Sequence, residues 1–175
     1  MDEDRFVTTK DDIISSLSKY PKCLDSTIDG KLIISYEELP NILLNTFNKK
    51  AVYNLIINSK IKQGKIGHWT SLIVFNSKIL FLLDGLNEIK SQIQVITNIK
   101  TFAKNNNLKI YDFNVRYQKP SSKKCGFLAC FFVYKSITCS LPKFLKLRKM
   151  LLNNSVSTNE NYIFNFVKKK FGLSF

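Results

Sequence analysis

The sequence predicts a single α+β domain in which a mostly antiparallel central sheet is flanked by helices. The chain has 175 residues, 45% of them hydrophobic, which is enough for one sizeable core and short for two. Short apolar runs rich in β-branched side chains alternate with stretches of helical periodicity. No repeat, linker or change of composition divides the chain, so residues 1–175 are expected to form one domain.

The N-terminal part of the chain predicts two helices. Residues 10–20 place apolar side chains on one helical stripe. Thr9 and Asp12 have the spacing of a capping box at the start of this helix, and Pro21 is expected to end it. A second, short helix is expected over residues 37–47.

The middle of the chain predicts three strands. Residues 51–58, 69–75 and 79–83 are apolar, as buried strands are. Asn76 and Ser77 separate the last two runs and predict a hairpin turn. Strands joined by so short a turn pair antiparallel, which supports the predicted kind of sheet.

The second half of the chain predicts mainly helices. Residues 125–139 are apolar nearly all round, which is typical of a central buried helix. The other expected elements are a helix from residue 89 that ends at residues 105–107, a strand at 109–116, and helices at 142–152 and 161–171, the last ending at Gly172.

Charge is distributed unevenly along the chain. The net charge of the whole chain is +14. Residues 1–99 carry 12 basic and 11 acidic side chains, whereas residues 100–175 carry 15 basic and 2 acidic side chains. Such an excess suggests a polyanionic partner, for which nucleic acid is the obvious candidate. The alternative is a lysine-rich surface encoded by an AT-rich gene, because only Arg5, Arg116 and Arg148 are arginines.

Metal, membrane and secretory functions are not expected. Cys23, Cys125, Cys130 and Cys139 lack the spacing of zinc ligands, and with a single His no metal or small-molecule cofactor is expected. No apolar run reaches the roughly 20 residues of a membrane span, and the acidic N-terminus does not resemble a secretory signal. The thiols are therefore expected to be reduced, in an intracellular setting.

Four polar residues fall at the ends of predicted elements. His68 precedes one strand of the hairpin, Asp84 ends the other, Gln118 follows the next strand, and Cys125 opens the apolar helix. A helix N-terminus favours a thiolate, and a nearby imidazole can take a proton and return it. A carboxylate can orient that imidazole, and the Gln118 amide can join the Cys125 backbone N–H in an oxyanion hole. Each residue alone is more often structural, but together they supply every role of a thiol peptidase.

The same residues resemble the adenain group, the adenovirus maturation proteases related to the SUMO-deconjugating Ulp proteases. That group has a His-Trp pair, an acid after the following strand, and a Gln six intervening residues before Cys-Gly. Here His68-Trp69, Asp84, Gln118 and Cys125-Gly126 follow this order, with six residues between Gln118 and Cys125. The resemblance spans about residues 50–135. It implies the adenain/Ulp-like fold, with Cys125 at the N-terminus of the buried helix.

Two departures qualify the resemblance. The acid is Asp84, where adenoviral enzymes more usually have Glu, and Lys124 stands where Ulp enzymes commonly have an acid. The second departure favours the viral branch, with a virophage or polinton-like virus as the source. The resemblance then implies a monomeric endopeptidase that processes viral capsid precursor proteins in the virion and the infected host cell. It also implies that Trp69 and Gly126 contact substrate and that DNA and a viral peptide act as activators.

DNA binding without sequence preference is expected from the basic C-terminal half, because lysines neutralise phosphates without reading bases. The candidate contacts are Lys119, Lys123, Lys124, Lys143, Lys146, Arg148, Lys149, Lys168, Lys169 and Lys170. Two alternatives to a maturation protease stay open. One is a SUMO or ubiquitin-like isopeptidase of the same fold, and the other is a non-enzymatic nucleic-acid-binding module.

Overall fold

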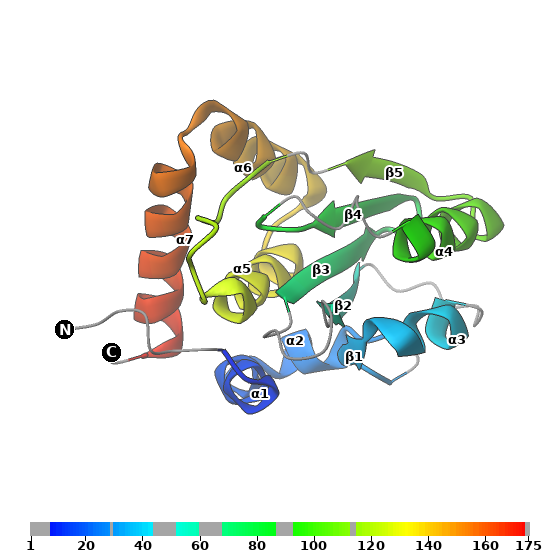
Figure 1. The fold of residues 1–175 in the computed structure, drawn as a ribbon, viewed down its shortest axis with the longest axis horizontal. Coiled ribbons are helices and arrows are strands. Elements are labelled where there is room, and N and C mark those ends of the chain that lie inside the picture. The colour runs from blue at the N-terminus through cyan, green and yellow to red at the C-terminus, as the bar shows by residue number, and fades with distance from the viewer. Residues whose placement is uncertain are drawn as a thin grey trace.

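Five strands form one mixed sheet at the centre of the molecule (Figure 1). The computed structural model describes residues 8–28, 30–43, 52–59, 68–86, 93–112 and 115–173, to which every structural statement below refers. The strands are β1 (Ile33–Ser35), β2 (Val52–Ser59), β3 (His68–Phe75), β4 (Ile79–Leu83) and β5 (Lys109–Asp112), in that spatial order. The β2–β3 and β3–β4 pairs are antiparallel, and the edge strands β1 and β5 pair in parallel.

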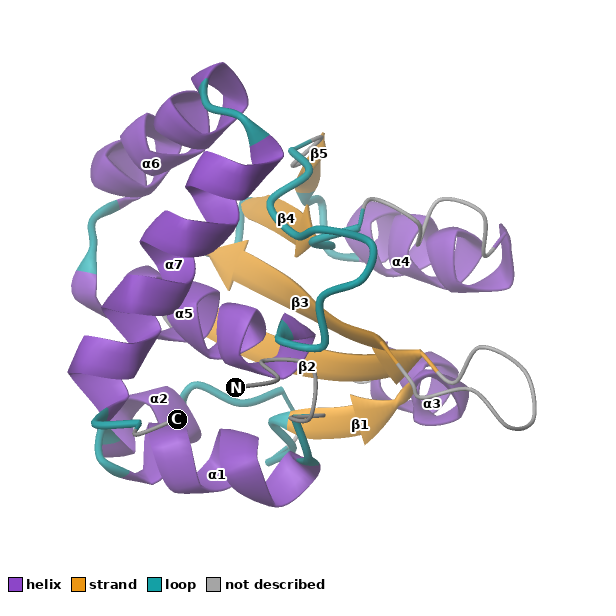
Figure 2. Cartoon of the chain, turned by 60° about the vertical axis from the view of Figure 1, so that its left-hand side comes forward, coloured by secondary structure: helices purple, strands orange, loops and turns teal. Residues whose placement is uncertain are grey.

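Helices cover both faces of this sheet (Figure 2). One layer holds α1, α5, α6 and α7, and the other holds α3 and α4. The helices are α1 (Lys10–Ser18), α2 (Pro21–Asp25), the 3-10 turn η2 (Tyr36–Glu38), α3 (Leu39–Leu43), α4 (Ile93–Asn105), α5 (Cys125–Thr138), α6 (Leu141–Asn153) and α7 (Val156–Phe171). The sheet is therefore the middle of three layers.

The alternation of side chains along β3 explains why both layers are needed. Ile73 and Phe75 pack in the core with α5, whereas Leu72 and Val74 pack in the core with α3 and α4. Successive residues of a strand point to opposite faces, so an apolar run of this kind leaves no face for water. All residues of β3 are buried, including His68 at its first position.

Helix α5 is the central helix of the larger layer. Residues 126–133 are buried without interruption, as a helix that is apolar all round requires. It packs against β3 on one side and against α1 and α7 on others. Cys125, its first residue, is only half-buried and lies where the apolar run begins.

Most of the predicted elements are confirmed. The α+β class, the capping box of Thr9 with Asp12, the hairpin and the central helix are all present. Asn76 and Ser77 both take a positive φ of 51° in the hairpin turn. The left-handed C-cap at Gly172 is present as well. The expected helical residues 44–47 and 89–92 lie outside the described residues.

Three boundaries differ from the prediction. Pro21 opens the short α2 instead of only ending α1, since proline suits a first helical turn. The strand expected at 109–116 ends at Asp112. The backbone N–H of Tyr117 donates to the carbonyl of Gly85, which belongs to no strand. Helix α7 begins at Val156 because Ser155 caps it, not at residue 161.

Strand β1 was not predicted. It has only three residues, and it exists through its parallel pairing with β2. The Ile56 N–H donates to the Leu32 carbonyl at 2.7 Å where the two strands meet. A pairing partner of this kind leaves no periodic pattern in so short a segment.

Phe144→Ala is expected to lower the free energy of unfolding by about 3–5 kcal/mol, because it removes a buried ring and leaves a cavity. Phe144 is fully buried, with its ring centroid 5.0 Å from that of Phe75 and 5.2 Å from that of Phe81. Urea unfolding followed by circular dichroism measures the change. Leu152→Ala on the same helix is the control, since Leu152 is 44% exposed. Equal losses in the two variants would contradict this packing of α6.

Candidate active site

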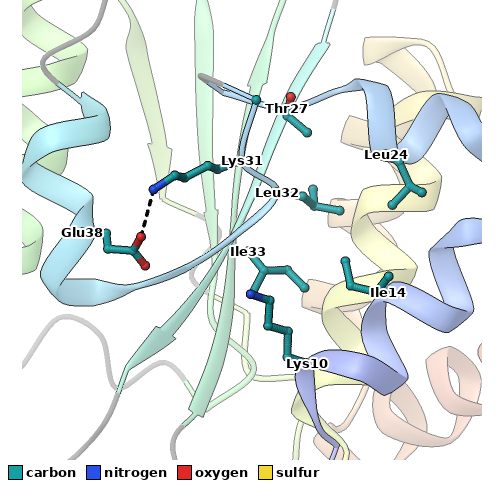
Figure 3. A pocket seen from close by; sticks show the side chains of 9 residues that line it. Lys10, Ile14, Leu24, Thr27, Lys31, Leu32, Ile33 and Glu38 are labelled. Carbon is teal, nitrogen blue, oxygen red and sulfur yellow. Dashed lines mark hydrogen bonds and ion pairs between the residues drawn. The ribbon is translucent and has the colours of Figure 1, made fainter.

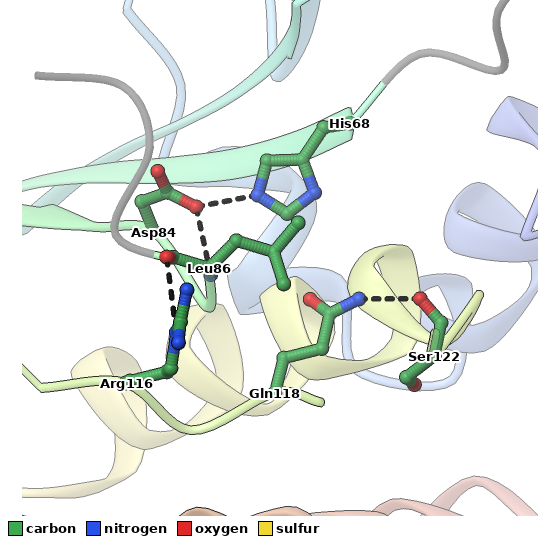
Figure 4. Close-up of polar contacts among 6 residues, drawn as sticks. All are labelled: His68, Asp84, Leu86, Arg116, Gln118 and Ser122. Atoms are coloured by element: carbon green, nitrogen blue, oxygen red, sulfur yellow. Dashed lines mark hydrogen bonds and ion pairs between the residues drawn. The ribbon is translucent and has the colours of Figure 1, made fainter. Parts of the chain in front are cut away.

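His68 and Asp84 meet at one end of the β3–β4 hairpin. His68 is the first residue of β3, and Asp84 directly follows β4 on the neighbouring antiparallel strand. Both side chains are buried, and His68 Nε2 lies 2.5 Å from Asp84 Oδ1 (Figure 4). The same carboxylate oxygen accepts the Leu86 backbone N–H at 3.1 Å. Two donors therefore hold the carboxylate in place.

The surroundings of His68 favour its charged form. Burial lowers the pKa of His68, but hydrogen bonds to Asp84 and then to Cys125, with the charges of both, raise this pKa from 6.5 to about 10. The imidazole is therefore protonated at neutral pH. Nε2 contacts Asp84, and the same imidazole has a side-chain hydrogen bond with Cys125.

Cys125 occupies the first position of α5. Its predecessor Lys124, at the N-cap, makes no side-chain capping bond. The first N–H groups of an α-helix have no partner within the helix, and Cys125 lies at this end of α5. The sulfur also takes part in a hydrogen bond with His68. The arrangement thus brings together a thiol, an imidazole and a carboxylate.

The other cysteines lie in different environments. Burial raises the pKa of Cys23 to about 11 and raises that of Cys130 further. Thiols in such apolar surroundings are poor nucleophiles, because they do not ionise. Cys139 is half-buried at the C-cap of α5, the end of the helix opposite to Cys125. Among the four cysteines, Cys125 alone adjoins His68.

Gln118 is buried near Asp84. The backbone N–H groups of Tyr117 and Gln118 both donate to the Gly85 carbonyl, at 3.2 and 3.1 Å, which ties this segment to the residue after Asp84. The Gln118 amide Nε2 donates to the Ser122 carbonyl at 2.7 Å (Figure 4). That carbonyl fixes which end of the amide faces the turn before Cys125, and one amide hydrogen remains for another acceptor.

Two glycines allow this close packing. A Cβ on Gly85 would lie 2.7 Å from Gln118 Oε1 and 2.9 Å from the Tyr117 ring. A Cβ on Gly126 would lie 2.4 Å from the Thr8 side chain and 3.0 Å from Trp69. This side of Gly126 is therefore filled by protein, and the residue is buried. Trp69 is buried as well, and its indole N–H donates to the Thr8 carbonyl at 2.9 Å.

Sequence reasoning missed three residues that support the site. Tyr117 lies beside it, since burial and then the charges of Asp84 and Cys125 raise the pKa of Tyr117 well above its usual value. Glu160 of α7 is buried and accepts the Lys119 N–H at 2.6 Å. Thr8 bonds the Lys123 carbonyl. Only Glu160 could have been found from the sequence, because it is one of only two acidic residues after residue 99.

The candidate DNA-contacting side chains lie in different settings. Lys143, Lys146 and Lys149 are exposed on α6, and Lys119, Lys123 and Lys169 are exposed elsewhere. Arg148 and Lys168 are half-buried. The ammonium of Lys124 lies 4.0 Å from the centroid of the Phe164 ring. The ammonium of Lys170 lies 5.2 Å from the centroid of the Tyr134 ring.

A groove of about 460 Å³ lies beside the edge strand β1, and its lining does not include His68, Asp84 or Cys125 (Figure 3). Apolar side chains such as Ile14, Leu24 and Ile33 line it, and Lys31 and Glu38 form an ion pair of 3.1 Å at its rim. Across the described ranges, no three metal-ligating side chains gather into a site. None of the described helices has the length and apolar character to cross a membrane.

Comparisons with known proteins give distant structural similarities. No family model matches the sequence, and no curated protein matches it. The ASFV pS273R protease matches with a TM-score of 0.38 and 14% identity over 71% of this chain and 45% of its own. The central domain of the uncharacterized Lpg1148 protein from Legionella pneumophila matches with a TM-score of 0.39 and 12% identity over 80% and 84%. The chain spans less than half of the ASFV protease, and TM-scores this low decide neither fold nor function.

Asp84→Asn is expected to move the alkaline limb of the kcat/KM profile to lower pH. The Asp84 carboxylate helps to raise the pKa of His68 to about 10, so without its charge the imidazole loses its proton at a lower pH. Peptide hydrolysis followed from neutral to alkaline pH measures the limb, because kcat/KM reports the free enzyme. Asp11→Asn, an exposed change on α1, is the control. If the alkaline limb of Asp84→Asn lies at the same pH as that of the unchanged protein, the role of Asp84 in raising the pKa of His68 is contradicted.

Proposed function

We propose that the protein is a cysteine endopeptidase in which Cys125, His68 and Asp84 form the catalytic triad. The observation that carries the proposal is the buried His68–Asp84 contact, 2.5 Å long, together with the hydrogen bond between the same imidazole and the half-buried Cys125. A thiol, a base and an orienting carboxylate in this order are what nucleophilic catalysis by cysteine requires. A purely structural histidine needs no nucleophilic neighbour at a helix N-terminus.

The first half of the reaction forms a thioester. The Cys125 thiolate attacks the carbonyl carbon of the scissile amide, and the carbonyl oxygen becomes an oxyanion. The free hydrogen of the Gln118 amide and the Cys125 backbone N–H stabilise this oxyanion. Protonated His68 then gives its proton to the nitrogen of the leaving amine as the C–N bond breaks. Asp84 keeps the imidazole oriented throughout.

The second half of the reaction regenerates the thiolate. Neutral His68 takes a proton from a water molecule, whose oxygen attacks the thioester carbon. The C–S bond breaks, the carboxylic acid product leaves, and the sulfur and imidazole return to their charged pair. Tyr117 stays neutral beside the site because its pKa is raised, so it places no further negative charge next to the thiolate.

The proposed substrates are viral capsid precursor proteins, cut during virion maturation. The support for this finer statement is the order of His68-Trp69, Asp84, Gln118 and Cys125-Gly126, which resembles the adenain group. A ubiquitin-like isopeptidase would use the same chemistry on a different amide. The two differ in substrate alone, so only a comparison of substrates separates them.

Cys125→Ala is expected to abolish hydrolysis of peptides that contain Gly-Gly, because triad members act as a unit and a missing nucleophile costs roughly 10⁴-fold or more. Release of a fluorescent amine from such peptides measures the activity. Cys139→Ala is the matched control at the other end of α5 and should keep the full rate. Activity of Cys125→Ala within about tenfold of the unchanged protein would contradict the triad.

The same assay, run with ubiquitin-like conjugates beside linear capsid-type peptides, tests the substrate. The proposal expects faster cleavage of the linear peptides. Faster release of the conjugates would favour the isopeptidase. Failure of both substrate types, together with no selective labelling of Cys125 by an electrophile, would leave the nucleic-acid-binding module as the better account.

A second function, binding of DNA without sequence preference, is favoured by the surface of α6. The helix contains Lys143, Lys146, Arg148 and Lys149 and no acidic residue, and its three lysines are exposed. Spacings of three residues bring these lysines to one side of the helix. Phosphates are the natural partners of such a row, and DNA bound there can act as an activator.

Changing Lys143, Lys146 and Lys149 to Glu is expected to weaken duplex binding strongly, with log K for the unchanged protein falling by about 0.9 per neutralised phosphate per decade of salt. Fluorescence anisotropy with unrelated duplexes at several salt concentrations measures both effects. The control changes Lys100, Lys104 and Lys109 to Glu, which alters net charge equally on exposed positions of α4 and β5. Equal losses in the two triple variants would show that net charge alone is responsible.

A further inference from the structure

We propose that Thr8 is a positioning residue of the active site, which holds the turn that carries Cys125 against the strand that carries His68. This inference rests on the proposed function, since it assigns a role within the same triad. Thr8 lies 60 residues before His68 and 117 before Cys125 in the sequence. No sequence pattern connects it to the chemistry.

Thr8 is first tied to β3. The indole N–H of Trp69 donates to the Thr8 carbonyl at 2.9 Å in a buried hydrogen bond. Trp69 is the residue next to His68 in the same strand. Thr8 itself is 3% exposed, so neither partner of this bond is open to water. A buried hydrogen bond of this kind is costly to break, because the donor and the acceptor would then be left without a hydrogen-bond partner, and no water can replace it.

Thr8 is also tied to the residues on both sides of Cys125. Its hydroxyl donates to the Lys123 carbonyl at 3.2 Å, two residues before the cysteine. Its methyl group fills the space beside Gly126, 2.4 Å from the point that a Cβ on that residue would occupy. One side chain therefore contacts the backbone before and after the nucleophile.

The position of Thr8 is itself well fixed. The next residue, Thr9, caps α1 through bonds with Asp12, so the chain leaves Thr8 directly into a helix. Ile13 and Leu17 bury that helix in the core shared with α5. Thr8 is thus a rigid link between two elements that each supply one half of the thiol–imidazole pair.

A break in this link is expected to separate sulfur and imidazole. Reacting groups tolerate little displacement, and a misplacement of about 1 Å can cost roughly 10²-fold in rate. The selective reactivity of Cys125 depends on the charged imidazole staying beside the sulfur. Loss of the Thr8 hydroxyl should therefore lower this reactivity at mildly acidic pH, where an isolated thiol does not ionise.

The test compares Thr8→Val, Thr8→Ser and Thr9→Val. Valine keeps the shape of threonine and removes the hydroxyl, whereas serine keeps the hydroxyl. Thr9→Val is the matched control, since it removes the hydroxyl that caps α1 from an exposed neighbour. The rate of alkylation of Cys125 by iodoacetamide is measured by mass spectrometry as a function of pH, with kcat and KM on a peptide as the second readout.

The expected result for Thr8→Val is a fall of about tenfold or more in the alkylation rate near about pH 6, with kcat reduced more than KM is changed. Thr9→Val should keep the alkylation profile of the unchanged protein, and Thr8→Ser, which loses the methyl group and keeps the hydroxyl, should fall clearly less than Thr8→Val. Circular dichroism checks the fold. If Thr8→Val does not fold, Trp69→Phe takes its place, because it removes the N–H that holds the Thr8 carbonyl, and the same fall is expected.

Different results overturn the two proposals. Fast alkylation of Cys125 that Thr8→Val leaves unchanged would overturn the role of Thr8 and keep the triad. A fall of equal size in Thr9→Val would reduce Thr8 to a residue that only stabilises α1, and would also overturn the inference. Equal alkylation rates at Cys125 and Cys139 in the unchanged protein would overturn the triad, and the role of Thr8 with it.

Discussion

A buried hydrogen bond between His68 and Asp84 joins the ends of two neighbouring strands at the candidate active site. An imidazole and a carboxylate are costly to bury separately, and they are stable inside the molecule because each is the partner of the other. Their contact requires β3 and β4 to end side by side, which the short turn at Asn76 and Ser77 ensures. The two helical layers then exclude water from β3 along its whole length. Burial alone would lower the pKa of His68, but the hydrogen bonds to Asp84 and Cys125 and the charges of both outweigh it and raise this pKa.

The second half of the site comes from segments that do not belong to the sheet. The turn between Gln118 and Cys125 is held near its start by Glu160 of α7 and near its end by Thr8, which precedes α1. Gly85 accepts two backbone bonds from the segment that carries Gln118. Residues from both ends of the chain therefore hold the segment that carries Gln118 and Cys125 in place.

The features of the structure that could be predicted from the sequence are those that depend on a few neighbouring residues. The capping box at Thr9, the hairpin turn and the apolar run behind Cys125 each reflect the backbone physics of a few neighbouring residues. The contact of His68 with Asp84 followed from that hairpin. Strand β1 and the partners Thr8 and Glu160 were not predictable, because each depends on segments 20 or more residues distant, as the 115 residues between Thr8 and Lys123 illustrate. The register of such contacts is decided by packing, which one sequence does not display.

The central claim is that the imidazole of His68 is held protonated between Cys125 and Asp84. His68 is the only histidine of the chain, so nitrogen-15 labelling of histidine gives one imidazole whose NMR signals need no assignment. We expect both ring nitrogens to stay protonated through neutral pH and the imidazolium to lose its proton with a pKa of about 10. It also predicts that this pKa falls when Cys125 is changed to Ala. A pKa that stays near 6.5 and does not respond to Cys125→Ala would contradict the thiol–imidazole pair.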